Sequence, residues 1–202
     1  MDRSASFKFP FTHTICPLAV TLVCLLLSVA TESASGWFEY HRDHISNGEI
    51  WRLITAHLVH LGWGHLTMNL LGLWMIWALL MNNLPSQHCG LILLFITLIT
   101  SAALWYFSPQ LVWYRGLSGA LHGLLIWGLF NRLKIEPLLS VSLLLAVTGK
   151  IAWEQWQGPL PGSESMADGP VVVASHLYGA LSGMLVWLIG RILFAINRKT
   201  SE

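Results

Sequence analysis

Residues 116–130 read GLSGALHGLLIWGLF, an apolar segment that begins with a serine between two short glycine-containing pairs. A second apolar segment, residues 171–196, carries His176 near its own start. Polar groups are costly to hold in lipid, so a serine and a histidine at corresponding ends of two hydrocarbon-length segments indicate function. Whether Ser118 and His176 meet depends on the number and direction of the segments around them.

The composition is that of a membrane protein. The chain has 202 residues, of which 54% are hydrophobic and only 10% charged, and its mean hydropathy is +0.60. A soluble domain of this size does not hide so much apolar surface behind so few charges. A membrane-spanning helix needs about 20 mostly apolar residues. We therefore predict an all-α membrane protein with six spans, at residues 14–30, 62–81, 89–107, 116–130, 137–151 and 171–196.

The first segment has a second interpretation. Arg3 and Lys8 precede it and small residues follow it, as in a cleaved signal sequence. No clear A-x-A cleavage site is present, which favours a span.

The distribution of lysine and arginine predicts the orientation. With both termini in the cytoplasm, the inside segments hold seven basic residues and the outside segments four, as the positive-inside rule favours. The inside set is Arg3, Lys8, Arg132, Lys134, Arg191, Arg198 and Lys199, and the outside set is Arg42, Arg52, Arg115 and Lys150. In this topology the second, fourth and sixth spans all begin at the outer face. The polar residues near those starts are His65, Asn69, Ser118, Ser175 and His176, so we expect them at one shallow level below the outer surface.

Small residues recur at four-residue spacing on the fourth and sixth spans. The fourth span has Gly119 and Gly123, and the sixth has Ser175, Gly179 and Gly183. Such stripes let two helices approach closely in lipid, which would bring His176 within reach of Ser118. Ordinary helix packing explains the same stripes without any chemistry.

The second span carries His65 and Asn69 four residues apart, on one face of a helix. Two neutral donors aimed at a cavity can stabilise a negative charge that develops on a carbonyl oxygen. Hydrogen bonds between helices are the alternative role for this pair. No Asp or Glu falls within spans two, four or six, so the predicted chemistry is a Ser–His dyad. His122 shares a helix face with Ser118 and is a candidate for tuning His176.

These residues resemble the rhomboid family of intramembrane serine proteases. The match consists of Glu49-Ile50-Trp51-Arg52, His60, His65 and Asn69, Gly116-Leu117-Ser118-Gly119, and His176 with Gly179, and it covers the chain from about Glu49 to Gly183. The run GLSGALHG at 116–123 and the short chain are similar to the rhombosortase branch. The resemblance implies one rhomboid-like membrane domain over residues 1–202.

The resemblance also implies roles for individual residues. Ser118 would be the nucleophile and His176 its general base and then general acid. His65, Asn69 and the backbone N–H of Ser118 would form the oxyanion site, and Trp51 and Arg52 would brace the first outer loop. His60, Gly116, Gly119 and Gly179 are further supporting positions. The sequence departs from typical rhomboids at His122, where an aromatic residue usually packs under the catalytic histidine.

As a rhombosortase-like protease, the chain would cleave exported membrane-anchored proteins near a C-terminal Gly-Gly-type motif followed by an apolar helix. It would lie in a bacterial inner membrane with its active site facing the periplasm, and would need no metal, cofactor or nucleic acid. A membrane cytochrome or other metal-binding protein is the alternative, since His57, His60, His65, His122 and His176 are all predicted near the outer face. A rhomboid-like protein that binds clients without cutting them is a third reading. The loop at 153–170 is rich in Gly, Pro and Ser and is predicted to be a mobile cap over the site.

Overall fold

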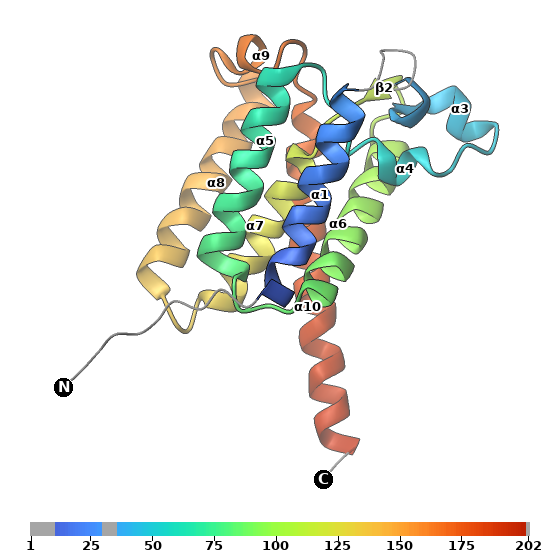
Figure 1. Cartoon of the computed structure of the whole chain (residues 1–202). Helices are drawn as coiled ribbons and strands as arrows, with labels where there is room; N and C mark the ends of the chain where they lie inside the picture. The colour runs from blue at the N-terminus through green and yellow to red at the C-terminus, as the bar shows by residue number, and fades with distance from the viewer. Residues whose placement is uncertain (1–10, 30–35, 201–202) are drawn as a thin grey trace.

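The computed structural model describes residues 11–29 and 36–200, and most of these residues are helical (Figure 1). The long helices are α1 Phe11–Val29, α5 Trp63–Ile76, α6 Ser86–Phe107, α7 Ser118–Arg132, α8 Pro137–Gln157 and α10 Val173–Thr200. The π-helix η1, Trp77–Met81, continues α5. Three short helices, α3 Arg42–Ser46, α4 Arg52–Thr55 and α9 Ser163–Met166, lie outside the bundle. The short strands β1 Tyr40–His41 and β2 Trp113–Tyr114, which the sequence did not predict, pair antiparallel with Tyr40 opposite Tyr114.

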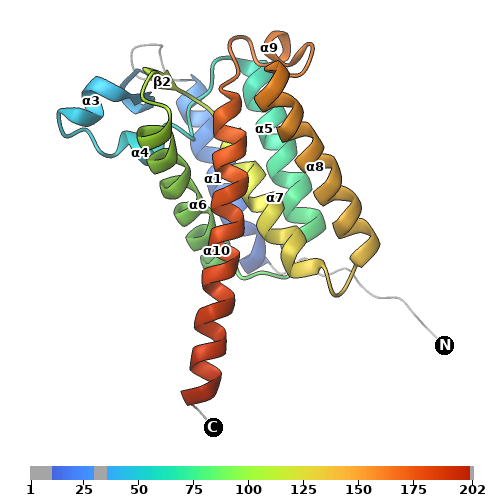
Figure 2. The same cartoon turned by 180° about the vertical axis from the view of Figure 1, so that it is seen from behind.

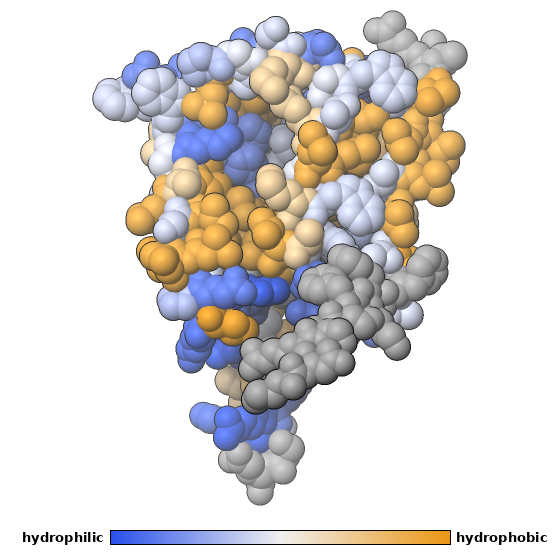
Figure 3. Space-filling model, turned by 60° about the vertical axis from the view of Figure 1, so that its left-hand side comes forward, coloured by the Kyte–Doolittle hydropathy of each residue, from blue (hydrophilic) through white to orange (hydrophobic). Residues whose placement is uncertain are grey.

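The protein is a multi-pass membrane protein. In the described part of the chain, five helical segments are long and apolar enough to cross a membrane: α1, α5 with η1, α6, α8 and α10. On the face shown in Figure 3, hydrophobic side chains form a broad band, with hydrophilic side chains toward both ends of the molecule. The predicted fourth span is α7, which has only 15 residues. That is about 22 Å at 1.5 Å per residue, short of the roughly 30 Å of a hydrocarbon core.

Helix α7 nevertheless occupies the centre of the bundle. It packs against α5, α6, α8 and α10, and both views place it among them (Figures 1 and 2). The main apolar core lies between α5, η1, α6 and α7, where Leu73, Trp77, Ile96, Leu124 and Leu129 are buried together. A central helix with neighbours on all sides is well placed to hold a reactive group in a fixed position.

The helices alternate in direction. Helix α1 begins and α10 ends at the same end of the bundle, whereas α5, α7 and α10 all begin at the opposite end, near α9 and the β ladder (Figure 1). Arg3 and Lys8, on which the predicted orientation partly depends, lie outside the described residues. The cytoplasmic location of the termini therefore stays a prediction.

Glycines set the distance between α7 and α10. A Cβ on Gly179 would collide with the carbonyl oxygen of Gly119, and one on Gly183 would collide with that of Gly123. The backbones of the two helices are thus in direct contact at the two small-residue stripes, which is the close approach that such stripes permit in lipid.

Helix α8 extends further than the sequence predicted. The fifth span was expected to end at residue 151, where the apolar run stops, but the helix continues to Gln157. The extra turns expose Trp153 and Trp156 while burying Glu154, so they are amphipathic rather than uniformly apolar. This extension moves Glu154 from a predicted outer loop into the bundle.

Candidate active site

Ser118 and His176 meet although they are 58 residues apart. Ser118 is the first residue of α7, and His176 lies one turn into α10. The Oγ atom of Ser118 is 3.0 Å from Nε2 of His176. The contact follows from the glycine packing of α7 against α10, because a larger distance between the two helices would separate the two side chains.

A carboxylate completes a three-residue arrangement. Oε2 of Glu154 lies 2.8 Å from Nδ1 of His176, and the Glu154 side chain is only 2% exposed. The prediction of a dyad rested on the absence of Asp and Glu from the second, fourth and sixth spans, and it was wrong in leaving out Glu154, which comes from α8. The spacing of Lys150 and Glu154, four residues apart, is the sequence signal that the helix continues past residue 151.

His122 stacks on His176. The two rings are nearly parallel, with centroids 4.3 Å apart and 20° between their planes. Nδ1 of His122 lies 2.8 Å from the carbonyl oxygen of Ser118, and its Nε2 lies 3.1 Å from Nζ of Lys150. The predicted candidate for tuning His176 therefore contacts it through a stacked ring.

His65 and Asn69 lie beside the segment that precedes Ser118. A Cβ on Gly116 would meet the ring of His65 and approach the Asn69 amide, so both side chains face this glycine. Gly116 also has φ +124°, in the region that glycine favours. Two independent constraints therefore require glycine at this position.

The donors of this pair point into the site. The Leu61 N–H lies 3.5 Å from Nδ1 of His65, which places the proton of a neutral imidazole on Nε2, the atom that faces Gly116. Nδ2 of Asn69 is buried and has no hydrogen-bond partner. The N–H of Ser118 belongs to the first turn of α7, where backbone donors lack partners within the helix. Three donors are thus available around Ser118.

A cavity of about 430 Å³ joins these groups. His65, Asn69, Ser118, Glu154 and His176 all line it, and most of its remaining lining is apolar and comes from α5, α7 and α8. The segment between α8 and α10 also borders the cavity, through Leu160, Ser163, Ala167 and Val171. Oδ2 of Asp168 accepts a hydrogen bond from the Gly64 N–H at 3.0 Å, which ties this cap to the start of α5.

The remaining predicted residues lie in the segment that precedes α5. His60 is buried and its ring packs edge-on against His65, at 5.1 Å between centroids. Arg52 is 3% exposed and donates to Glu49 at 2.6 Å and to the carbonyl oxygens of Gly36 and Glu39 at 2.6 and 2.8 Å. Nε1 of Trp51 donates to the carbonyl oxygen of Trp37 at 3.2 Å.

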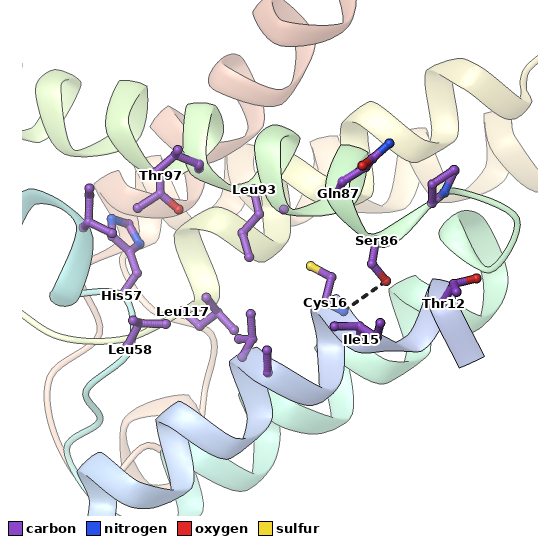
Figure 4. A pocket seen from close by; sticks show the side chains of 16 residues that line it. Thr12, Ile15, Cys16, His57, Leu58, Ser86, Gln87, Leu93, Thr97 and Leu117 are labelled. Carbon is purple, nitrogen blue, oxygen red and sulfur yellow. Dashed lines mark hydrogen bonds between the residues drawn. The ribbon is translucent and has the colours of Figure 1, made fainter. Parts of the chain in front are cut away.

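A larger cavity lies between α1 and α6, apart from Ser118 (Figure 4). It has a volume of about 790 Å³ and a mostly apolar lining. His57 borders it, but Nε2 of that histidine already pairs with Oγ of Ser101 at 2.9 Å. This cavity contains no arrangement of a nucleophile and a base among its lining residues.

The residues suited to a metal are His122, Glu154 and His176, whose ligand atoms lie within 4.8 Å of one another. Lys150 lies among them: its Nζ is 3.1 Å from His122, 2.7 Å from Glu154 and 3.3 Å from His176. The Lys150 ammonium group thus supplies, beside these three side chains, the positive charge that a metal ion would bring. His57, His60 and His65 are not part of this group in the described residues.

Residues 47–192 match the family model described as "Rhomboid domain". This chain belongs to the rhomboid family. The match contains Ser118, His176, Glu154 and the whole second span, and it confirms the family that the sequence motifs predicted. Among curated proteins, the rhomboid protease GluP of Bacillus subtilis (strain 168) is 32% identical over 122 residues, which are 58% of this chain and 24% of that relative. This rhomboid thus matches about a quarter of the length of the relative.

Proposed function

We propose that this rhomboid is an intramembrane serine endopeptidase with Ser118 as nucleophile and His176 as base. The observation that carries the proposal is the 3.0 Å contact between Ser118 Oγ and His176 Nε2, from two different helices, in a cavity lined by His65 and Asn69. A hydroxyl and an imidazole in such contact form the activated nucleophile of acyl transfer. Membership of the rhomboid family supports this reaction class.

The chemistry assigns each group one task. His176 Nε2 takes the Ser118 proton as Oγ bonds to the substrate carbonyl carbon, and the resulting oxyanion accepts hydrogen bonds from His65, Asn69 and the Ser118 N–H. The C–N bond then breaks, and His176 gives its proton to the departing amine. Water, activated by the same imidazole, hydrolyses the acyl-serine ester and releases the carboxylic acid product.

The proposed topology places this chemistry at the outer face. We take α7 as a sixth span, shortened because it is enclosed by other helices rather than by lipid. Both termini are then cytoplasmic, as the excess of lysine and arginine on that side favours. The whole of residues 1–202 forms one rhomboid-like domain in a bacterial inner membrane, with the site opening toward the periplasm.

The proposed substrates are exported proteins with a C-terminal Gly-Gly-type anchor, by the resemblance of residues 116–123 to the rhombosortase branch. A membrane helix must unwind before its peptide bond can reach Ser118, and each glycine lowers helix stability by about 1 kcal/mol relative to alanine. Small residues also suit a cavity in which Ser118 begins one of two closely packed helices.

The experiment uses the purified full chain in detergent and in liposomes. A fluorophosphonate probe should label the wild type but not Ser118→Ala, and only the wild type should cleave a fusion protein with a Gly-Gly-containing anchor. A matched fusion with Ala-Ala in place of Gly-Gly tests the substrate class separately. Labelling or cleavage that persists in Ser118→Ala removes the proposed nucleophile. Absence of both in a folded wild type favours a client-binding rhomboid that does not cut.

A further inference from the structure

Helix α8 presents two charged side chains to the active site. Lys150 and Glu154 are four residues apart and paired at 2.7 Å, between Nζ and Oε1. The second carboxylate oxygen of Glu154 faces His176 Nδ1 at 2.8 Å. Each oxygen of the carboxylate therefore has its own partner, one on α8 itself and one on α10.

The partners determine where the protons reside. A carboxylate only accepts hydrogen bonds, so His176 carries its proton on Nδ1 and keeps the Nε2 lone pair for Ser118. The Ser118 carbonyl likewise only accepts, so His122 carries its proton on Nδ1 and accepts from Lys150 at Nε2. Lys150 then donates to both Glu154 and His122, and its 3.3 Å approach to His176 Nδ1 is not a hydrogen bond because both atoms carry protons.

Burial of these charged side chains carries a cost in free energy. A buried carboxylate within a membrane-spanning helix loses its hydration, and an ion pair there recovers that loss only with good geometry and additional hydrogen bonds. An apolar residue at position 154 would fill the same space without the penalty. The charged pair is therefore better explained by its effect on His176 than by packing.

We propose that Glu154 and Lys150 are positioning residues of this site, Glu154 holding the imidazole of His176 in its reactive tautomer and Lys150 holding Glu154 and the stacked His122 in place. The inference rests on the proposed function of Ser118 and His176. When His176 takes the Ser118 proton, it becomes an imidazolium 2.8 Å from a carboxylate, which stabilises the new charge. The proton stays on Nε2 until the departing amine takes it, and Glu154 remains ionised throughout.

The main test is Glu154→Gln, which preserves size but offers an amide. Its NH₂ group can donate to Nδ1 and so favour the wrong tautomer, and the corresponding substitution in serine proteases lowers kcat by about 10⁴-fold. We expect a fall in kcat of about 10²- to 10⁴-fold with KM within about twofold, and an equal fall in the rate of fluorophosphonate labelling. Glu136→Gln makes the same chemical change near the start of α8, in a partly exposed pair with Arg132, and should retain wild-type rates.

The pH dependence of kcat/KM distinguishes a positioning role of Glu154 from a folding defect. The groups that face His176 are His122 from α7, Lys150 and Glu154 from α8, and His65 from α5. Loss of the only anion among them should move the acid limb of kcat/KM to lower pH in Glu154→Gln. A purely structural defect lowers the amount of active protein and leaves the shape of the profile unchanged.

Two further variants keep the test decisive. The double variant Lys150→Met with Glu154→Gln removes both charges together. It should fold because no lone charge is left buried, and its kcat should still be low. His122→Phe keeps a stacked ring but loses the hydrogen bond from Lys150, and it should lower kcat less than Glu154→Gln does. Wild-type kcat and pH profile in Glu154→Gln, or in the double variant, would overturn the inference while leaving Ser118 and His176 as the proposed catalytic residues. Failure of the wild type to label would instead count against the proposed function.

Discussion

Gly179 lies so close to Gly119 that a methyl group on the former would collide with the carbonyl oxygen of the latter. The two residues belong to α10 and α7, and each lies within one turn of a proposed catalytic residue. Their contact therefore sets the separation of Ser118 and His176, and a change of one methyl group at this point alters the site without touching either side chain.

Gly179→Ala is expected to inactivate the protein by widening this contact. Overpacking of this kind costs about 1–3 kcal/mol, and any outward shift of α10 lengthens the 3.0 Å contact between Ser118 and His176. Fluorophosphonate labelling and thermal unfolding in detergent measure the two effects. Gly190→Ala is the control, because a Cβ there meets nothing within 4 Å. Equal labelling of both variants would show that α7 and α10 tolerate a wider spacing.

Asn69→Ala should lower kcat without destroying the fold. Its unpaired Nδ2 is positioned to stabilise an oxyanion, and loss of one such donor costs about 10²–10³ in rate. Steady-state cleavage of a membrane-anchored substrate provides the measurement. Asn131→Ala removes an exposed asparagine on α7 and should behave as wild type. If Asn69→Ala were as inactive as Ser118→Ala and also less stable, a structural role for the amide would be indicated.

Stability should fall on acidification because of two buried histidines between α4 and α5. Burial lowers the pKa of His57 to about 3, and burial together with the nearby His65 lowers that of His60 to about 3. Between about pH 6.5 and those values the unfolded chain binds protons that the folded chain does not. The stabilisation is complete above about pH 6.5 and is lost as the pH falls, by up to about 1.4 kcal/mol per pH unit for each histidine.

Thermal unfolding at several pH values between 7.5 and 4.5 checks this expectation. His60→Asn should flatten the dependence, whereas His88→Gln, which replaces an exposed histidine at the start of α6, should leave it unchanged. Identical slopes in His60→Asn and the wild type would mean that another group controls the acid response.

Arg52→Ala is expected to destabilise the segment between α1 and α5 more than it affects the chemistry. The guanidinium is buried and connects Glu49 with the carbonyl oxygens of Gly36 and Glu39, so its removal leaves one carboxylate and two carbonyls without their donor. A buried acceptor left without its donor costs about 1–3 kcal/mol, and two carbonyl oxygens lose their donor here. Unfolding in detergent should show this loss, while labelling of the folded fraction stays near wild type. Arg191→Ala, at an exposed position of α10, should change neither quantity.

Apolar runs and helical spacing were sufficient to predict most of the architecture. They predicted a mostly helical membrane protein, and the motifs at 49–52, 60–69, 116–119 and 176–179 predicted the rhomboid family, which the family match confirms. The small residues at 119, 123, 179 and 183 predicted the close pair of helices, because backbone contact in lipid requires an absent side chain. The paired β strands had no such signal, since two residues are too few to show a period.

Tertiary structure alone decided the surroundings of His176. The sequence ended the fifth span where its apolar run ended, at residue 151, and so counted Glu154 as a loop acid. The helix continues because one face of its last turns packs against α10 while Trp153 and Trp156 on the other face are exposed, a distinction that hydropathy along the chain does not resolve. Distances between helices depend on packing, so the contacts of Glu154, Lys150 and His122 with His176 and with one another emerge only when α7, α8 and α10 come together.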